Sequence, residues 1–236
     1  MAYTALQLAN AFLQTGELTD ARQTIADYLS KDVSADLDYE AVLRLWIDLL
    51  AHGDEADQRL ALSEYDRLPH FSATDYIKRA MLHYRLGELS SSRGILEIGL
   101  ATTPDDERLC ESLLFIYKKI GDSQAGLSLI KTLPKKWVWS RWAGDFSLMN
   151  ADGYMAIAHY SEAIQLLEMR YSLSDATPAQ ILSDPAMNDA EKLTIMGVYA
   201  DILLARAEAY HLAGKVEDAK RDEARAKRLI PNDPTL

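Results

Sequence analysis

The stretch Ala207–Pro231, AEAYHLAGKVEDAKRDEARAKRLIP, decides the fold of this chain. It predicts two helices joined by a tight turn, in which Gly214 ends the first helix and Pro231 stops the second. Small residues recur at helical spacing on both helices, so the two backbones can approach closely. These residues are Ala207, Ala219 and Ala226, with Tyr210 filling the space beside them. The stretch therefore predicts an antiparallel helix pair.

The same glycine-centred turn recurs along the chain. Gly53, Gly87 and Gly121 follow one another at intervals of 34 residues, and Gly16 and Gly214 stand in the same pattern. Each of these glycines follows one apolar helical run and precedes another. Two equal steps in succession are hard to obtain by accident. The spacing resembles the tetratricopeptide repeat, a 34-residue helix–turn–helix unit that stacks into a solenoid.

The resemblance implies an all-α, right-handed superhelical solenoid of antiparallel helix pairs, with about six repeats and about twelve helices. We expect a single domain over residues 1–236. Its repeats lie at about 2–35, 36–70, 73–106, 107–140, 144–177 and 200–233, with an insertion at about 178–199.

Two of these repeats depart from the simple glycine-centred pattern. In the fifth, we favour a turn at Ala158 over an alternative that ends a helix near Asn150 and turns at Asp152-Gly153. In the sixth, an unbroken amphipathic run from Asn188 to Ala213 predicts a first helix extended by about two or three turns.

The composition and net charge of the chain argue against several classes of function. The net charge of −11 argues against a general nucleic-acid binder and against docking on an anionic membrane surface. No apolar run reaches about 18 residues, and the N-terminus lacks the features of a signal peptide. The single cysteine, Cys110, lies among apolar residues and is expected to be a buried, inert thiol. A cytoplasmic protein is the expectation.

We expect no enzymatic activity, cofactor or metal. No glycine-rich phosphate loop is present, and no serine, threonine or cysteine carries a local nucleophile signature. No two histidines have the i, i+4 spacing of a helical metal site. The five histidines are His52, His70, His83, His159 and His211.

Positive charge recurs at equivalent places in the repeats. Arg44 and Lys78 are 34 residues apart, as are Arg85 and Lys119, and Lys78 and Arg85 lie seven apart on one helix face. The resemblance implies that the first helices of successive pairs line a concave, peptide-binding surface. A strip of Arg and Lys along this surface favours the binding of an acidic or C-terminal carboxylate peptide. The competing interpretation is that exposed Arg and Lys simply aid solubility. The predicted peptide-binding residues are Asn10, Arg44, Lys78, Arg85 and Lys119.

Some members of the family hold acidic tails with a two-carboxylate clamp of Lys and Asn. Asn10 stands at the place of one clamp asparagine. Leu6 replaces the neighbouring lysine, and Arg44 replaces another asparagine. That particular clamp is therefore predicted to be absent.

The segment Lys135–Trp142, KKWVWSRW, interleaves tryptophans with cations. Trp and Arg dominate binding energy at protein interfaces, so the segment is a candidate partner patch. Packing that fills a gap between the fourth and fifth repeats is the competing interpretation, with membrane or nucleic-acid contact further behind. The patch residues are Trp137, Trp139, Arg141 and Trp142.

The leading hypothesis is a non-catalytic adaptor or assembly scaffold that binds a peptide or helix of another protein in its groove. Self-association is the second, because the last repeat is apolar along Leu193–Leu212 and the insertion lies beside it. The third is a regulatory helical-repeat subunit of a larger complex.

Overall fold

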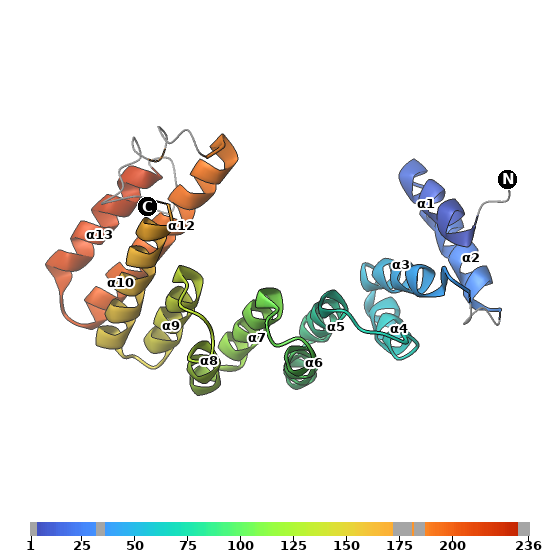
Figure 1. The fold of residues 1–236 in the computed structure, drawn as a ribbon, viewed down its shortest axis with the longest axis horizontal. Coiled ribbons are helices and arrows are strands. Elements are labelled where there is room, and N and C mark those ends of the chain that lie inside the picture. The colour runs from blue at the N-terminus through green and yellow to red at the C-terminus, as the bar shows by residue number, and fades with distance from the viewer. Residues whose placement is uncertain (1–3, 32–35, 172–180, 182–186, 231–236) are drawn as a thin grey trace. The chain divides into compact units, whose positions relative to one another are not determined.

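The structure, a computed structural model, describes residues 4–31, 36–171, 181 and 187–230. Twelve helices lie within these ranges, and no strand is found among the residues described (Figure 1). The predicted all-α helical-repeat fold is confirmed. The chain divides into two compact units, Met1–Leu113 and Leu114–Leu236, with the boundary inside one helix.

The helices of the N-terminal unit follow each other as short antiparallel pairs. They are α1 (Ala5–Thr15), α2 (Leu18–Leu29), α3 (Tyr39–Ala51), α4 (Glu55–Tyr65), α5 (Ala73–Arg85), α6 (Leu89–Thr102) and the first half of α7 (Glu107–Ile120). The C-terminal unit holds the second half of α7, α8 (Ser123–Ile130), α9 (Trp137–Met149), α10 (Gly153–Arg170), α12 (Asp189–Leu212) and α13 (Val216–Leu229).

Side-chain caps explain why several of these helices begin where they do. A short polar side chain just before the helix accepts a hydrogen bond from a backbone N–H of the first turn, which has no partner within the helix. The residues that do so are Thr4, Asp54, Ser72, Asp122, Asp152 and Asn188. Asn188 forms a reciprocal capping box with Glu191, so α12 starts at Asp189 and is 24 residues long. The predicted extension of this helix is confirmed.

Left-handed residues end the first helix of most pairs. Gly16, Gly87, Gly121 and Gly214 have φ angles of 81°, 77°, 79° and 74°. Ala151 is the one non-glycine residue with a positive φ in the described ranges, at 55°. After each of these residues, the next N–H bonds back to a carbonyl five residues earlier; Asp152 N, for example, donates to Ser147 O at 2.9 Å. Gly53, in contrast, is not left-handed.

The favoured turn at Ala158 is therefore wrong, and the alternative near Asn150 is right. Helix α10 runs unbroken from Gly153 to Arg170, and Ala158 lies within it. The turn glycine that marks the other pairs is replaced by Ala151, so the sequence signal was missing at the true turn. An alanine can take the left-handed conformation, but at a cost that glycine avoids.

Replacing Ala151 with glycine should therefore stabilise the protein. We expect Ala151→Gly to raise the free energy of unfolding by about 1 kcal/mol, because it relieves the left-handed strain. Ala158→Gly is the matched control and should lower that free energy by about 1 kcal/mol, because Ala158 is exposed in a helix interior. Urea denaturation followed by circular dichroism measures both. A turn at Ala158 would reverse the two signs.

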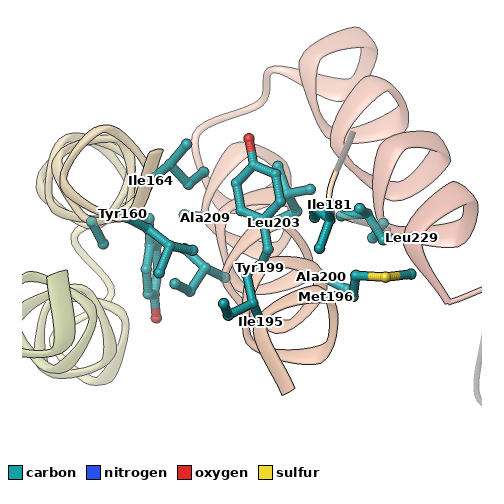
Figure 2. Packing of buried hydrophobic residues seen from close by; sticks show 14 of the residues in the cluster. Tyr160, Ile164, Ile181, Ile195, Met196, Tyr199, Ala200, Leu203, Ala209 and Leu229 are labelled. Atoms are coloured by element: carbon teal, nitrogen blue, oxygen red, sulfur yellow. The ribbon is translucent and has the colours of Figure 1, made fainter. Parts of the chain in front are cut away.

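Each unit has its own apolar core. In the N-terminal unit the largest side chains without solvent exposure include Ile25, Leu43 and Leu50. In the C-terminal unit, Tyr160 of α10 and Tyr199 of α12 are fully buried in one cluster with Leu203 (Figure 2). This cluster also contains Ile181, which is 0% exposed. Ile181 belongs to the predicted insertion, of which residues 178–180 and 182–186 lie outside the described residues.

Within the ranges that the structure covers, no helix is both long enough and apolar enough to cross a membrane.

Candidate functional site

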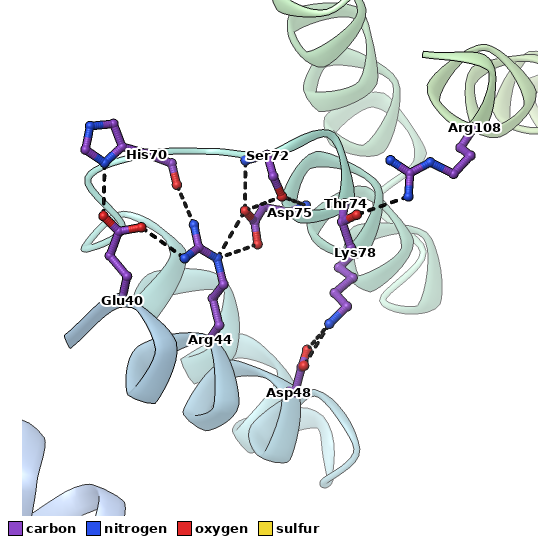
Figure 3. A network of polar contacts seen from close by, with 9 residues as sticks. All are labelled: Glu40, Arg44, Asp48, His70, Ser72, Thr74, Asp75, Lys78 and Arg108. Atoms are coloured by element: carbon purple, nitrogen blue, oxygen red, sulfur yellow. Dashed lines mark hydrogen bonds and ion pairs between the residues drawn. The ribbon is translucent and has the colours of Figure 1, made fainter. Parts of the chain in front are cut away.

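A network of charged side chains covers the surface formed by α3, α5 and the segment before α5 in the N-terminal unit (Figure 3). Arg44 of α3 lies at its centre. The Nε of Arg44 donates to Asp75 Oδ1 at 3.2 Å, and Nη1 donates to Glu40 Oε2 at 3.0 Å. Its Nη2 donates to the carbonyl oxygen of His70 at 2.8 Å. Arg44 therefore joins α3 to α5 and to the connection that precedes α5.

Asp75 is held in place from two sides. It lies in the first turn of α5, where its carboxylate accepts hydrogen bonds from Ser72 N at 2.8 Å and Ser72 Oγ at 2.7 Å. Arg44 approaches from α3, and only 4% of Asp75 is exposed. Burial by itself would raise the pKa of Asp75, but the hydrogen bonds from Ser72 and Arg44 outweigh burial and hold the pKa below its ordinary value.

This lowered pKa predicts a loss of stability in acid. The unfolded chain takes up the Asp75 proton at a higher pH than the folded chain does, so the stabilisation is complete above about pH 4 and is lost as the pH falls through the lower native pKa. We expect Asp75→Asn to lower the free energy of unfolding by about 2 kcal/mol at neutral pH. The difference from wild type should shrink below about pH 4. Denaturation curves across this pH range measure it, and a difference independent of pH would contradict the assignment.

Two further cations reach from α5 to the end of α3. Lys78 Nζ lies 2.8 Å from Asp48 Oδ1 and 2.7 Å from Asp48 Oδ2. Arg85, seven residues further along α5, donates from Nη2 to the carbonyl oxygen of Ala51 at 2.9 Å. A cation beside the last carbonyls of a helix is favourable, because these carbonyls carry partial negative charge. Lys78 and Arg85 therefore meet the last turn of α3, where Asp48 also lies.

The structure thus brings three of the predicted peptide-binding residues together: Arg44, Lys78 and Arg85. Asn10 is exposed on α1 in the same unit and takes no part in the network of Figure 3. Lys119 belongs to the C-terminal unit, where its Nζ lies 5.2 Å from the centre of the Phe115 ring. A peptide-binding role for these five residues stays a prediction.

The sequence reading missed the acidic partners of these cations. Asp48 and Asp75 lie 30 and 31 residues from Lys78 and Arg44. The same arrangement links the second helices, where Arg22 of α2 contacts Asp57 of α4 at 2.8 Å and Arg59 of α4 contacts Glu88 at 3.0 Å. A search for opposite charges about one repeat apart would have indicated such pairs.

The tryptophans of the predicted partner patch all lie on α9 in the C-terminal unit. Trp137 packs against the apolar cluster of Tyr160, and Trp139 is buried. Trp142 stacks on Phe146 with ring centres 6.1 Å apart, and Lys118 Nζ lies 5.7 Å from the Trp142 ring. Arg141 and Trp142 are half-buried. Much of the aromatic surface is therefore used in packing, and the role of this patch in binding stays a prediction.

The described residues contain no group of three or more His, Cys, Asp or Glu side chains that could hold a metal ion. Cys110 is buried, and burial together with the charges of Asp106 and Glu107 raises the pKa of its thiol. A protonated, buried thiol is a poor nucleophile.

These observations define an all-α helical-repeat protein with the tetratricopeptide-repeat fold. No protein-family model matches the sequence, and no curated protein sequence matches it. Similar solved structures show the fold. One is a tetratricopeptide repeat protein from Parabacteroides merdae, with a TM-score of 0.55 and 15% identity over 98% of this chain and 94% of that one.

Two other solved structures show the same likeness. MamA from Desulfovibrio magneticus has a TM-score of 0.56 and 10% identity over 84% of this chain and 98% of that one. BtubC from P. vanneervenii has a TM-score of 0.54 and 17% identity over 96% of this chain and 91% of that one.

Proposed function

We propose that this protein is a non-catalytic adaptor or assembly scaffold, whose α3–α5 surface binds a segment of another protein. The observation that carries the proposal is the charged surface in Figure 3, built across neighbouring helix pairs of a repeat fold. Stacked helix pairs offer extended surfaces suited to long, flexible partner segments. The proposal places the protein in the cytoplasm, in keeping with a single cysteine that has no second cysteine for an internal disulfide.

The partner segment that suits this surface is acidic. Arg44 is tied to Asp75 and Glu40, so its charge is compensated within the protein. Lys78 and Arg85 are exposed side chains on one helix, and a guanidinium has five N–H donors, so one bond to Ala51 leaves donors for a carboxylate. Carboxylates bound by Arg and Lys form charge-assisted hydrogen bonds, which are stronger than neutral ones.

Affinity capture from a lysate of the source organism tests the proposal. The bait proteins are the wild type, Lys78→Glu/Arg85→Glu, and the matched control Arg22→Glu/Arg59→Glu, which reverses two cations of the second helices. We expect a partner that the wild type and the control retain and that the first variant loses by roughly tenfold or more. A wild type that retains no other protein would overturn the proposal, and equal capture by all three would move the site away from α5.

Self-association is the second candidate, and an exposed apolar cluster in the C-terminal unit favours it. Tyr154, Leu212 and Val216 are exposed large apolar residues near the turn between α12 and α13. The first residue of α10, Gly153, lies against Leu212, and Lys215 Nζ lies 5.4 Å from the centre of the Tyr154 ring. Clustered exposed apolar side chains often mark interaction sites.

Sedimentation velocity over a range of concentrations separates the candidates. Self-association predicts a concentration-dependent increase in mass that Leu212→Gln/Val216→Gln abolishes. A monomer at all concentrations removes this candidate. Retention of one large assembly in the capture experiment would instead support the third hypothesis, a regulatory subunit of a larger complex.

A further inference from the structure

The carboxylate of Asp48 occupies the place that a partner's carboxylate would take. Both of its oxygens lie within 2.8 Å of Lys78 Nζ, so the ammonium is engaged by the protein itself. We propose that Asp48 is an internal competitor: it pairs with Lys78 in the free protein, and an acidic partner segment displaces it. This inference rests on the proposed function, because it concerns the same surface.

The two carboxylates that link α3 to α5 differ in how firmly they are held. Asp75 has a side chain 6% exposed and is bonded to both Ser72 and Arg44. The side chains of Asp48 and Lys78 are 40% and 47% exposed. A buried charge that loses its partner is strongly destabilising, whereas an exposed ion pair contributes little. The Arg44–Asp75 pair is therefore fixed, and the Lys78–Asp48 pair can exchange.

The surroundings of Lys78 favour a ligand with more than one carboxylate. Arg85 lies seven residues away on α5, or about 10 Å along the helix axis. Three residues of an extended chain span about the same distance. An acidic segment can therefore place one carboxylate at Lys78 and another at Arg85. The first of these replaces Asp48, which then turns to solvent.

This arrangement predicts that the loss of the negative charge of Asp48 strengthens the binding of an acidic peptide, whereas the loss of a negative charge elsewhere does not. We would measure the affinity of an acetylated, amidated hexaglutamate peptide at low salt by fluorescence anisotropy. Asp48→Asn should bind it about two- to fivefold more tightly than the wild type, because residue 48 then neither pairs with Lys78 nor repels the acidic peptide. Asp48→Ser also lacks the carboxylate and should give the same gain.

Asp57→Asn is the matched control. It removes one carboxylate and releases one cation, Arg22, from a pair of the same kind between α2 and α4. If only overall charge mattered, this variant would gain as much as Asp48→Asn. In a Lys78→Gln background, the gain from Asp48→Asn should disappear, since the two residues act as a pair.

An affinity of Asp48→Asn equal to that of the wild type, or an equal gain in Asp57→Asn, would overturn the inference. So would failure of the peptide to bind either protein. None of these results decides the proposed function, which fails if the wild type captures no other protein.

Discussion

Gly144→Ala should lower the free energy of unfolding by about 3 kcal/mol, because there is no room for a methyl group where α9 crosses α10. A Cβ at residue 144 would lie 2.5 Å from Cε1 and 2.6 Å from Cδ1 of Tyr160. The Tyr160 ring is fully buried, and its hydroxyl donates to Asp145 Oδ1 at 2.7 Å. The ring cannot move aside without losing this bond, so the helices themselves must shift.

Gly197→Ala is the control for this prediction. Gly197 lies in α12 of the same unit, and a Cβ there would meet no atom within 4 Å. The substitution should therefore stabilise the protein by about 0.5–1 kcal/mol, through the better helix propensity of alanine. Denaturant unfolding of both variants measures the contrast. A Gly144→Ala variant as stable as the wild type would mean that α9 and α10 do not cross at this residue.

Ile181→Ala should have an effect of the same size, a loss of about 3 kcal/mol in the free energy of unfolding. Ile181 lies in the connection between α10 and α12 and is 0% exposed, in one cluster with Met196 and Leu229 (Figure 2). Truncating a buried isoleucine removes its transfer free energy and leaves a cavity. The substitution therefore tests whether Ile181 forms part of the core.

Ile98→Ala provides the comparison, because Ile98 is 56% exposed on α6. It should change the free energy of unfolding by no more than about 0.5 kcal/mol. Equal, small effects of the two substitutions would show that Ile181 is not buried in solution.

The sequence predicted the helical-repeat fold because turn glycines and apolar periodicity are local signals. Gly87 and Gly121 end their helices in the left-handed conformation, at the 34-residue spacing of the repeat. The prediction went wrong where that signal was absent. Ala151 adopts the conformation of a turn glycine. A residue other than glycine keeps this conformation only where the surrounding structure imposes it, and no local rule indicates an alanine for that role.

In the candidate site, too, the sequence predicted some features and the packing of the helices decided others. Helical spacing was enough to place Lys78 and Arg85 on one face of a helix, and the 34-residue recurrence was enough to relate Lys78 to Arg44. Their partners lie on the neighbouring helix pair, about 30 residues away in sequence. Which carboxylate faces which cation depends on how the helix pairs stack, and so does the solvent exposure of each ion pair.

The sequence by itself therefore determined the class of fold, the position of most turns and the cations of the candidate surface, because each follows from neighbouring residues or from the repeat length. Only the tertiary structure decided that Arg44 is locked by the buried Asp75 and that Lys78 is paired with the exposed Asp48. The physical reason is that the strength of an ion pair depends on burial and on the hydrogen bonds around it, which are properties of packed helices and not of the chain alone.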